Sequence, residues 1–276
     1  MNTTIKKKYN AKVLLFGEYT IIDGGSALSV PFSEFSGHWC ELEGRSLIPF
    51  FNHLKSIKKS NQEKLDSAIN NNWTFCSNIP IGYGCGSSGA LTAAAYESFF
   101  DQEANTLKDE KVALAEIENF FHGQSSGLDP LVSLKNKPIL VNDRSISTVG
   151  LTSLNMAFFL VDSKRKRKTS DLVKVYNQKK AESATFRENI ETLNKHNDQA
   201  ISALLCGDKS NLLECFRKIS QIQWEYFQEM IPDNIKPIWI KGLETKAYYI
   251  KLSGAGGGGF FLGIGNYNGE SIQLDF

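Results

Sequence analysis

The sequence predicts an α+β protein of two domains, one over residues 1–150 and one over residues 151–276. In the first part, short apolar runs typical of strands are mixed with stretches whose apolar residues recur at helical spacing. In the second part, the helical pattern dominates. A chain of 276 residues is long enough for one large domain or two of ordinary size, so length agrees with this division.

The N-terminus is predicted to be rich in strands. Ala11–Phe16 is a short apolar run that ends at Gly17-Glu18, as a buried strand would. Lys12 lies near its start, and an edge position with the ammonium in water explains it as well as a function does. The run IIDGGSALSVPF carries a turn signal and a second short strand, and Phe35–Glu43 is predicted as a third.

A glycine-rich stretch, Ile79–Leu91, follows two predicted helical segments between Pro49 and Asn71 and a strand, WTFCSNI. Three glycines at alternate positions precede Ser-Ser-Gly and a helix-forming run, LTAAAYESFF. Free N–H groups and the helix dipole attract anions at such a junction, so we interpret the loop as a phosphate cradle rather than a plain turn. It has neither the Lys-Ser/Thr pair of a P-loop nor G-x-G-x-x-G spacing.

A single carboxylate stands in the loop GQSSGLDPLVSL, which follows an amphipathic helix at Lys111–Phe121. It belongs to Asp129, and Pro130 is expected to hold the backbone there in an extended conformation that leads into a strand. An Asx turn is the plain structural explanation, and a functional carboxylate is the alternative. No G-x-S-x-G elbow accompanies His122, so a hydrolase triad is not expected.

The second half of the chain is predicted to begin with a strand at Asn155–Asp162 and a basic run, Lys164–Lys168. A solvated loop is the usual explanation of such a run, although it would attract an anionic substrate if it faced the phosphate site. Asp171–Met230 is expected to form three helices, broken near Asn197 and at Gly207-Asp208.

A strand at Lys246–Lys251 then leads into LSGAGGGGFFLGI. Its four consecutive glycines, Gly256–Gly259, predict a loop whose backbone closely approaches another group.

Composition limits the partners and the compartment. The chain has 31 basic and 30 acidic residues, so no net charge favours nucleic acid or an anionic membrane. No apolar run approaches the roughly 20 residues that span a bilayer, and a cytoplasmic protein is expected. Without a C-x-x-C pair, the five cysteines are interpreted as reduced, mostly buried thiols: Cys40, Cys76, Cys85, Cys206 and Cys215.

Three segments together resemble the GHMP small-molecule kinases. They are KVLLFGEYTIIDGG at Lys12–Gly25, PIGYGCGSSGA at Pro80–Ala90 and KLSGAGGGG at Lys251–Gly259. A fourth, ENFFHGQSSGLD at Glu118–Asp129, resembles the mevalonate kinase segment E-x-x-x-H-G-x-x-S-G-x-D position by position. The resemblance implies an N-terminal mixed β/α domain with the phosphate loop, a helix-rich ferredoxin-like C-terminal domain, and an active site in the cleft between them.

The resemblance also implies roles for single residues. Asp129 would take or orient the proton of the acceptor hydroxyl, and Lys12 beside it would offset negative charge on the attacking oxygen and the γ-phosphate. Ser88 and Glu118 would hold Mg²⁺. Glu18 and Tyr19 would lie on the acceptor side. The ATP-binding set would be Pro80, Gly82, Gly84, Gly86, Ser87, Ser88, Gly89, Ser253, Gly254, Ala255, Gly256 and Gly257.

The expected reaction is ATP-dependent phosphorylation of a small-molecule alcohol, with mevalonate giving 5-phosphomevalonate in isoprenoid precursor synthesis as the favoured case. Tyr19 stands where mevalonate kinases commonly have histidine, and a G-E-Y turn also occurs in phosphomevalonate kinases. Ser125 and Cys85 replace the usual proline and leucine. Phosphomevalonate, homoserine and sugar kinases are the alternatives, with a catalytically silent regulatory homologue behind them; a homodimer is left open.

Overall fold

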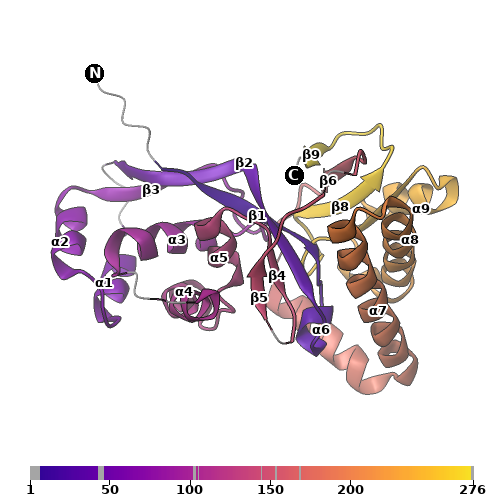
Figure 1. The fold of residues 1–276 in the computed structure, drawn as a ribbon, viewed down its shortest axis with the longest axis horizontal. Coiled ribbons are helices and arrows are strands. Elements are labelled where there is room, and N and C mark those ends of the chain that lie inside the picture. The colour runs from indigo at the N-terminus through magenta and orange to yellow at the C-terminus, as the bar shows by residue number, and fades with distance from the viewer. Residues whose placement is uncertain are drawn as a thin grey trace. The chain divides into compact units, whose positions relative to one another are not determined.

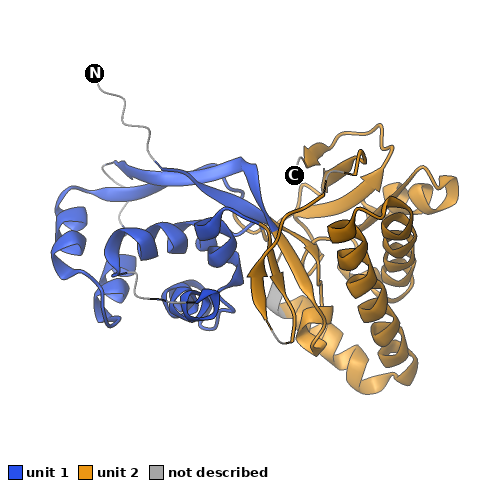
Figure 2. Ribbon diagram, viewed as in Figure 1, with its two compact units in different colours: residues 1–12, 30–80, 85–137 blue, residues 13–29, 81–84, 138–276 orange. Residues whose placement is uncertain are grey.

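The protein is seen here in a computed structural model, which describes residues 7–42, 47–101, 104, 106–143, 145–152, 154–167 and 169–274 (Figure 1). Its contacts divide the chain into two compact units, each assembled from separate stretches (Figure 2). Unit 1 comprises residues 1–12, 30–80 and 85–137, and unit 2 comprises residues 13–29, 81–84 and 138–276. The α+β class is confirmed, and the domain boundary at residue 150 stays a prediction.

The first sheet of the described chain has the order β1-β2-β4-β5, with β3 also paired to β2. Its strands are β1 (Tyr9–Phe16), β2 (Ala27–Glu41), β3 (Trp73–Ser77), β4 (Ile139–Val141) and β5 (Ile146–Thr148). The prediction of two short strands within β2 is wrong. This strand stays continuous because it has partners along its length, β4 at Ala27–Ser29 and β3 at Gly37–Glu41.

The helices of unit 1 include one buried helix, α3, on which most of the others pack. They are α1 (Ile48–Ser56), α2 (Gln62–Asn70), α3 (Ser87–Phe99), α4 (Leu107–His122) and α5 (Leu128–Lys135). The alanines of LTAAAYESF are fully buried in α3, and their small side chains let α4 and α5 pack closely against it. Figure 1 shows these helices on one side of β2 and β3. The predicted strand–glycine loop–helix junction is confirmed.

The prediction of five reduced cysteines is wrong for one pair. Cys40 on β2 and Cys76 on β3 form a disulfide with Cα atoms 6.0 Å apart. Cys76 lies opposite His38, two residues from Cys40, so the register of the two strands brings the thiols together diagonally. Cys85 and Cys215 are buried thiols outside this disulfide, as predicted, whereas Cys206 is exposed.

Unit 2 contains the second sheet, in the order β7-β8-β6-β9. Its strands are β6 (Phe158–Asp162), β7 (Tyr248–Leu252), β8 (Phe260–Gly265) and β9 (Ile272–Leu274). Its helices are α6 (Thr169–Glu182), α7 (Ala184–Cys206), α8 (Lys209–Tyr226) and α9 (Lys236–Thr245), with short 3₁₀ turns η1 (Thr20–Asp23) and η2 (Gln228–Met230). The helices α8 and α9 both pack on β7, and Trp239 of α9 is completely buried.

The predicted helix break near Asn197 is wrong, whereas the break at Gly207-Asp208 is confirmed. Asn197 is buried inside α7, where its amide donates a hydrogen bond to the Ser26 carbonyl 2.8 Å away. A tertiary partner thus satisfies the side chain, and the helix continues. The break lies instead at Ser183, whose hydroxyl caps α7 by accepting the N–H of Phe186.

No helix in the described part of the chain is long and apolar enough to cross a bilayer. Two ends of predicted segments, Glu43 of the third strand and Lys168 of the basic run, lie outside the described residues.

Candidate active site

The glycine loop ends in a helix N-terminus that has no side-chain cap. Gly82, Gly84 and Gly86 have positive φ angles of 83°, 71° and 74°. Gly86 is the N-cap residue of α3, and its carbonyl accepts the Ala90 N–H at 2.8 Å. The N–H groups of the three residues before Ala90 lie in the first helical turn, where helix geometry supplies them no acceptor. They form the anion-attracting end of α3 in unit 1.

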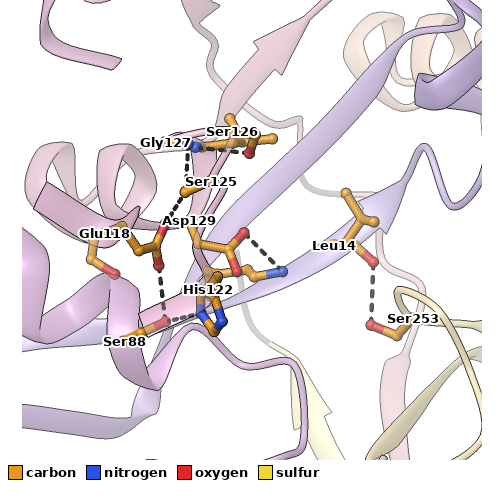
Figure 3. A network of polar contacts seen from close by, with 12 residues as sticks. Leu14, Ser88, Glu118, His122, Ser125, Ser126, Gly127, Asp129 and Ser253 are labelled. Atoms are coloured by element: carbon orange, nitrogen blue, oxygen red, sulfur yellow. Dashed lines mark hydrogen bonds and ion pairs between the residues drawn. The ribbon is translucent and has the colours of Figure 1, made fainter. Parts of the chain in front are cut away.

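Lys12 does not extend into water. Lys12 is only 6% exposed, and its Nζ lies 3.1 Å from Asp129 Oδ1 in an ion pair within unit 1, which is the dashed line from Asp129 in Figure 3. The Lys12 N–H also donates to the Cys85 carbonyl at 3.0 Å, which ties β1 to the end of the glycine loop. The explanation of Lys12 as a residue with its ammonium in water is therefore wrong.

The backbone at Asp129 is helical rather than extended, and the strand predicted after it is helix α5. Gly127, with φ of 70°, begins this helix, and Asp129 and Pro130 occupy its first turn. A proline is tolerated there because N–H groups of the first turn have no intrahelical partner to lose. The rule for residues before proline is overridden, and the carboxylate is fixed by a helix start packed against α3.

Two glycines allow α3 to approach this carboxylate. A Cβ on Gly89 would lie 2.9 Å from the carbonyl carbon of Asp129 and from the Pro130 nitrogen. A Cβ on Gly86 would lie 3.0 Å from Lys12 Cγ. Any larger residue would push the helix N-terminus away from the Lys12–Asp129 pair. In unit 1, these glycines therefore let the start of α3 lie directly against the two predicted catalytic residues.

Glu118 of α4 is joined to the first turn of α3. Its Oε1 accepts the Ser88 hydroxyl at 2.9 Å, and its Oε2 accepts the Ser125 hydroxyl at 2.5 Å (Figure 3). The His122 Nε2 lies 3.0 Å from the same Ser88 oxygen. Burial, and then the nearby charge of Asp129, raises the pKa of the Glu118 carboxyl above its ordinary value.

Two residues that contact Ser88 and Glu118, namely His122 and Ser125, were not predicted from the sequence to belong to the site. His122 follows Glu118 by four residues on one helix, and that spacing could have identified it as a neighbour. Ser125 counted only as a departure from a family pattern, yet its hydroxyl orients Glu118.

The oxygens of Ser88 and Glu118 suit a hard cation such as Mg²⁺. Within the described ranges, no group of three or more His, Cys, Asp and Glu side chains could hold a metal ion by itself. A Mg²⁺ ion here would therefore depend on water or substrate phosphates for most of its ligands, which is its usual behaviour.

Unit 2 holds the other predicted residues around the second glycine loop, Ser253–Gly257. The Glu18 carboxylate is buried and paired with Lys251, and the Tyr19 hydroxyl donates to the Ala255 carbonyl at 2.7 Å. Gly254, Gly256 and Gly257 have positive φ angles. The Ser253 hydroxyl donates to the Leu14 carbonyl at 3.4 Å (Figure 3).

Arg167, from the predicted basic run, also lies at these loops in unit 2. Its N–H donates to the Gly82 carbonyl and its Nη1 to the Ser253 carbonyl, both at 3.0 Å. A Cβ on Gly84 or Gly254 would collide with the guanidinium. Part of the run therefore contacts both glycine loops, which its composition alone did not distinguish from a solvated loop.

The predicted residues thus fall into two sets. The first is in unit 1, where the structure brings Lys12, Asp129, Ser88 and Glu118 together beside Gly86, Ser87 and Gly89, with Pro80 half-buried before the loop. The second is in unit 2 and comprises Glu18, Tyr19, Gly82, Gly84 and Ser253–Gly257. Their functional roles stay predictions.

Comparison with known proteins supports the fold and the N-terminal signature. Residues 52–136 match the family model of the GHMP kinases N terminal domain. The L. major mevalonate kinase, solved in complex with R-mevalonate, is 18% identical with a TM-score of 0.68, over 96% of this chain and 88% of that one. The Methanococcus jannaschii mevalonate kinase is 19% identical with a TM-score of 0.65, over 96% and 92%.

A Streptococcus pneumoniae phosphomevalonate kinase, in complex with phosphomevalonate and AMPPNP, is 16% identical with a TM-score of 0.67, over 95% and 92% of the two chains. No curated protein sequence matches the chain. Likeness at such identities establishes the fold and leaves the substrate open. Residues 52–136 thus match the GHMP kinases N terminal domain, and nearly the whole chain has the fold of the solved mevalonate and phosphomevalonate kinases.

Proposed function

We propose that this protein is an ATP-dependent kinase that transfers the γ-phosphoryl group of ATP to the hydroxyl of a small molecule. One observation carries the proposal. The Asp129 carboxylate lies 3.1 Å from the buried Lys12 ammonium, at the N-terminus of α3, whose Ser88 is hydrogen-bonded to Glu118. Phosphoryl transfer requires positioning and charge neutralisation. These residues offer a carboxylate, a cation, free N–H groups and two oxygen ligands for that purpose.

Each residue has a distinct part in the proposed reaction. Asp129 orients the acceptor hydroxyl and takes its proton as the oxygen attacks. Lys12 stays beside this oxygen and stabilises the negative charge that develops there. The α3 N-terminus, from Ser87 to Gly89, binds phosphate oxygens through backbone N–H groups.

Ser88 and Glu118 would hold Mg²⁺, which when bound neutralises phosphate charge. Before the metal binds, Ser125 and His122 keep this pair oriented through their contacts with Glu118 and Ser88. In unit 2, the second glycine loop, Ser253–Gly257, stays a proposed nucleotide-binding segment, and Glu18 and Tyr19 stay the proposed acceptor-side residues.

Mevalonate is the favoured acceptor. The segment Glu118–Asp129 resembles that of mevalonate kinases, and three of its pattern residues, Glu118, His122 and Asp129, are the ones that contact Ser88 or Lys12. Phosphomevalonate is the second candidate because of the G-E-Y turn at Gly17–Tyr19 and the similar likeness to a phosphomevalonate kinase.

The test is release of ADP from ATP, measured with mevalonate, phosphomevalonate, homoserine and galactose as acceptors. We expect turnover with mevalonate. Asp129→Asn should lower it by about 10³-fold or more, because the substitution removes both the base and the negative charge that orients the acceptor hydroxyl. Asp66→Asn, which alters an exposed carboxylate of α2 in the same unit, is the matched control and should keep wild-type turnover. No turnover on any acceptor, or an active Asp129→Asn variant, would refute the proposal.

A further inference from the structure

A lysine is buried in the middle of unit 2. Lys251, near the end of strand β7 and just before the second glycine loop, is 0% exposed. Its Nζ pairs with the Glu18 carboxylate, donates to the Leu252 carbonyl at 2.8 Å, and lies 5.4 Å from the centroid of the Phe16 ring. The pair joins residues 233 positions apart in the sequence.

The turn that contains Glu18 contacts the loop at further points. The Glu18 carboxylate also accepts a hydrogen bond from the backbone of Gly254. The next residue, Tyr19, donates to the carbonyl of the next loop residue, Ala255, at 2.7 Å. Two consecutive residues of the G-E-Y turn thus hold two consecutive residues of the loop, and Lys251 fixes the carboxylate between them.

The loop needs such external support. Gly254, Gly256 and Gly257 have positive φ angles and no side chains that could pack. Glycine also has the largest conformational entropy to lose when its backbone becomes fixed. The polar contacts from the turn provide constraints that the loop itself cannot supply.

Stability alone does not explain why the constraint is built this way. A buried ion pair loses its hydration, and an apolar pair of similar size is often as stable or more stable. Tyr19 is also held at a φ of 62°, which is unusual and strained for a bulky residue. A costly pair and a strained turn, both directed at one loop, indicate that the position of this loop matters.

We propose that Lys251 is a positioning residue that, through Glu18, sets the nucleotide loop Ser253–Gly257 from the G-E-Y turn. The assignment of this loop to ATP rests on the proposed function, whereas the positioning of the loop by Lys251 does not depend on it. Because the same turn is proposed to border the acceptor, its contacts also link the acceptor side to the nucleotide loop.

The experiment compares full-length Lys251→Met with wild type by hydrogen–deuterium exchange and by calorimetric titration of ATP with Mg²⁺. We expect faster exchange in the peptides around Glu18 and Ser253–Gly257, and an ATP Kd raised about tenfold or more because the loop is misplaced. Lys179→Met, which breaks the partly exposed ion pair with Glu229 in the same unit, is the control. It should leave exchange at the loop and the Kd unchanged.

If Lys251→Met does not fold, the double variant Glu18→Gln/Lys251→Met decides, because it leaves no unpaired buried charge. In either folded variant, faster loop exchange together with a raised Kd supports the proposal, and a wild-type value of either overturns it. If the wild-type protein binds no ATP, the proposed function fails, whereas loop exchange alone still decides whether Lys251 positions the loop.

Discussion

Gly89→Ala is the substitution that best separates stability from catalysis in this site. Gly89 is in the first turn of α3, and a methyl group there would lie 2.9 Å from the backbone of Asp129 and of Pro130. This is about 0.6 Å or more short of the optimal separation of carbon atoms. The obstacle is backbone at the start of α5, so no side-chain rotation relieves it.

Two opposing contributions to stability can be estimated. Alanine is favoured over glycine in a helix by about 1 kcal/mol, whereas overpacking of a well-packed region costs about 1–3 kcal/mol. The expected net loss is about 0–2 kcal/mol, or a fall in Tm of at most about 8 °C for a chain of this size. Activity should suffer more, because a displacement of this order at the Lys12–Asp129 pair lowers kcat/KM by about 10- to 100-fold.

The assay is ADP release with the best acceptor, alongside thermal unfolding of the same samples. Gly150→Ala is the matched control, because a methyl group on Gly150 meets no described atom within 4 Å. It should change neither Tm nor kcat/KM. A Gly89→Ala enzyme with raised Tm and wild-type kcat/KM would show that α3 and Asp129 do not approach as closely as we describe.

Three further predictions concern the metal ligands, the disulfide and an ion pair of unit 1. Glu118→Gln should raise the Mg²⁺ concentration for half-maximal rate by at least about tenfold, and an unchanged Mg²⁺ titration would count against Glu118 as a ligand. Replacing the Cys40–Cys76 disulfide, which closes a loop of 36 residues, with two serines should lower the free energy of unfolding in urea by about 3–4 kcal/mol. Five reactive thiols in the denatured, unreduced protein would contradict that disulfide. Burial raises the pKa of the Glu97 carboxyl, but hydrogen bonds from Lys7 and Tyr9 outweigh it, and the net pKa is lowered from 4.5. The ionised Glu97 carboxylate therefore stabilises the fold above pH 4.5, and this stabilisation is lost as the pH falls through the lowered pKa. The Tm difference between wild type and Glu97→Gln should accordingly shrink below pH 4.5. A difference that stays constant with pH would show that the charge of Glu97 is not its source.

The sequence was most informative where local signals suffice. Alternation of glycines before Ser87 predicted a loop and a helix start, and both are present. The apolar run at Ala11–Phe16 predicted β1 for the same reason. It was least informative where a distant partner decides the outcome. Lys12 is buried because Asp129, more than a hundred residues later, neutralises it, and Asn197 continues a helix because Ser26 accepts its amide hydrogen bond.

Local rules also failed where two of them compete. Pro130 predicted extended backbone at Asp129, but a proline in a first helical turn is equally regular, and only packing against α3 selects the helix. Cys40 and Cys76 follow from a strand register that the separate runs do not specify. Family likeness supplied the residues of the site, whereas Ser125, Arg167 and Lys251 emerged only from their contacts.

The contact between Glu18 and Lys251 has a consequence for how the chain folds during synthesis. Unit 2 takes residues 13–29 and 81–84 from early in the chain, and Glu18 among them cannot meet Lys251 until residue 251 has been made. Closing so long a loop is slow, and until it closes the Glu18 carboxylate lacks the ammonium that pairs with it. Unit 1, which is complete at residue 137, can fold first, whereas the second sheet of unit 2 also needs β7, β8 and β9, the last strands to be made.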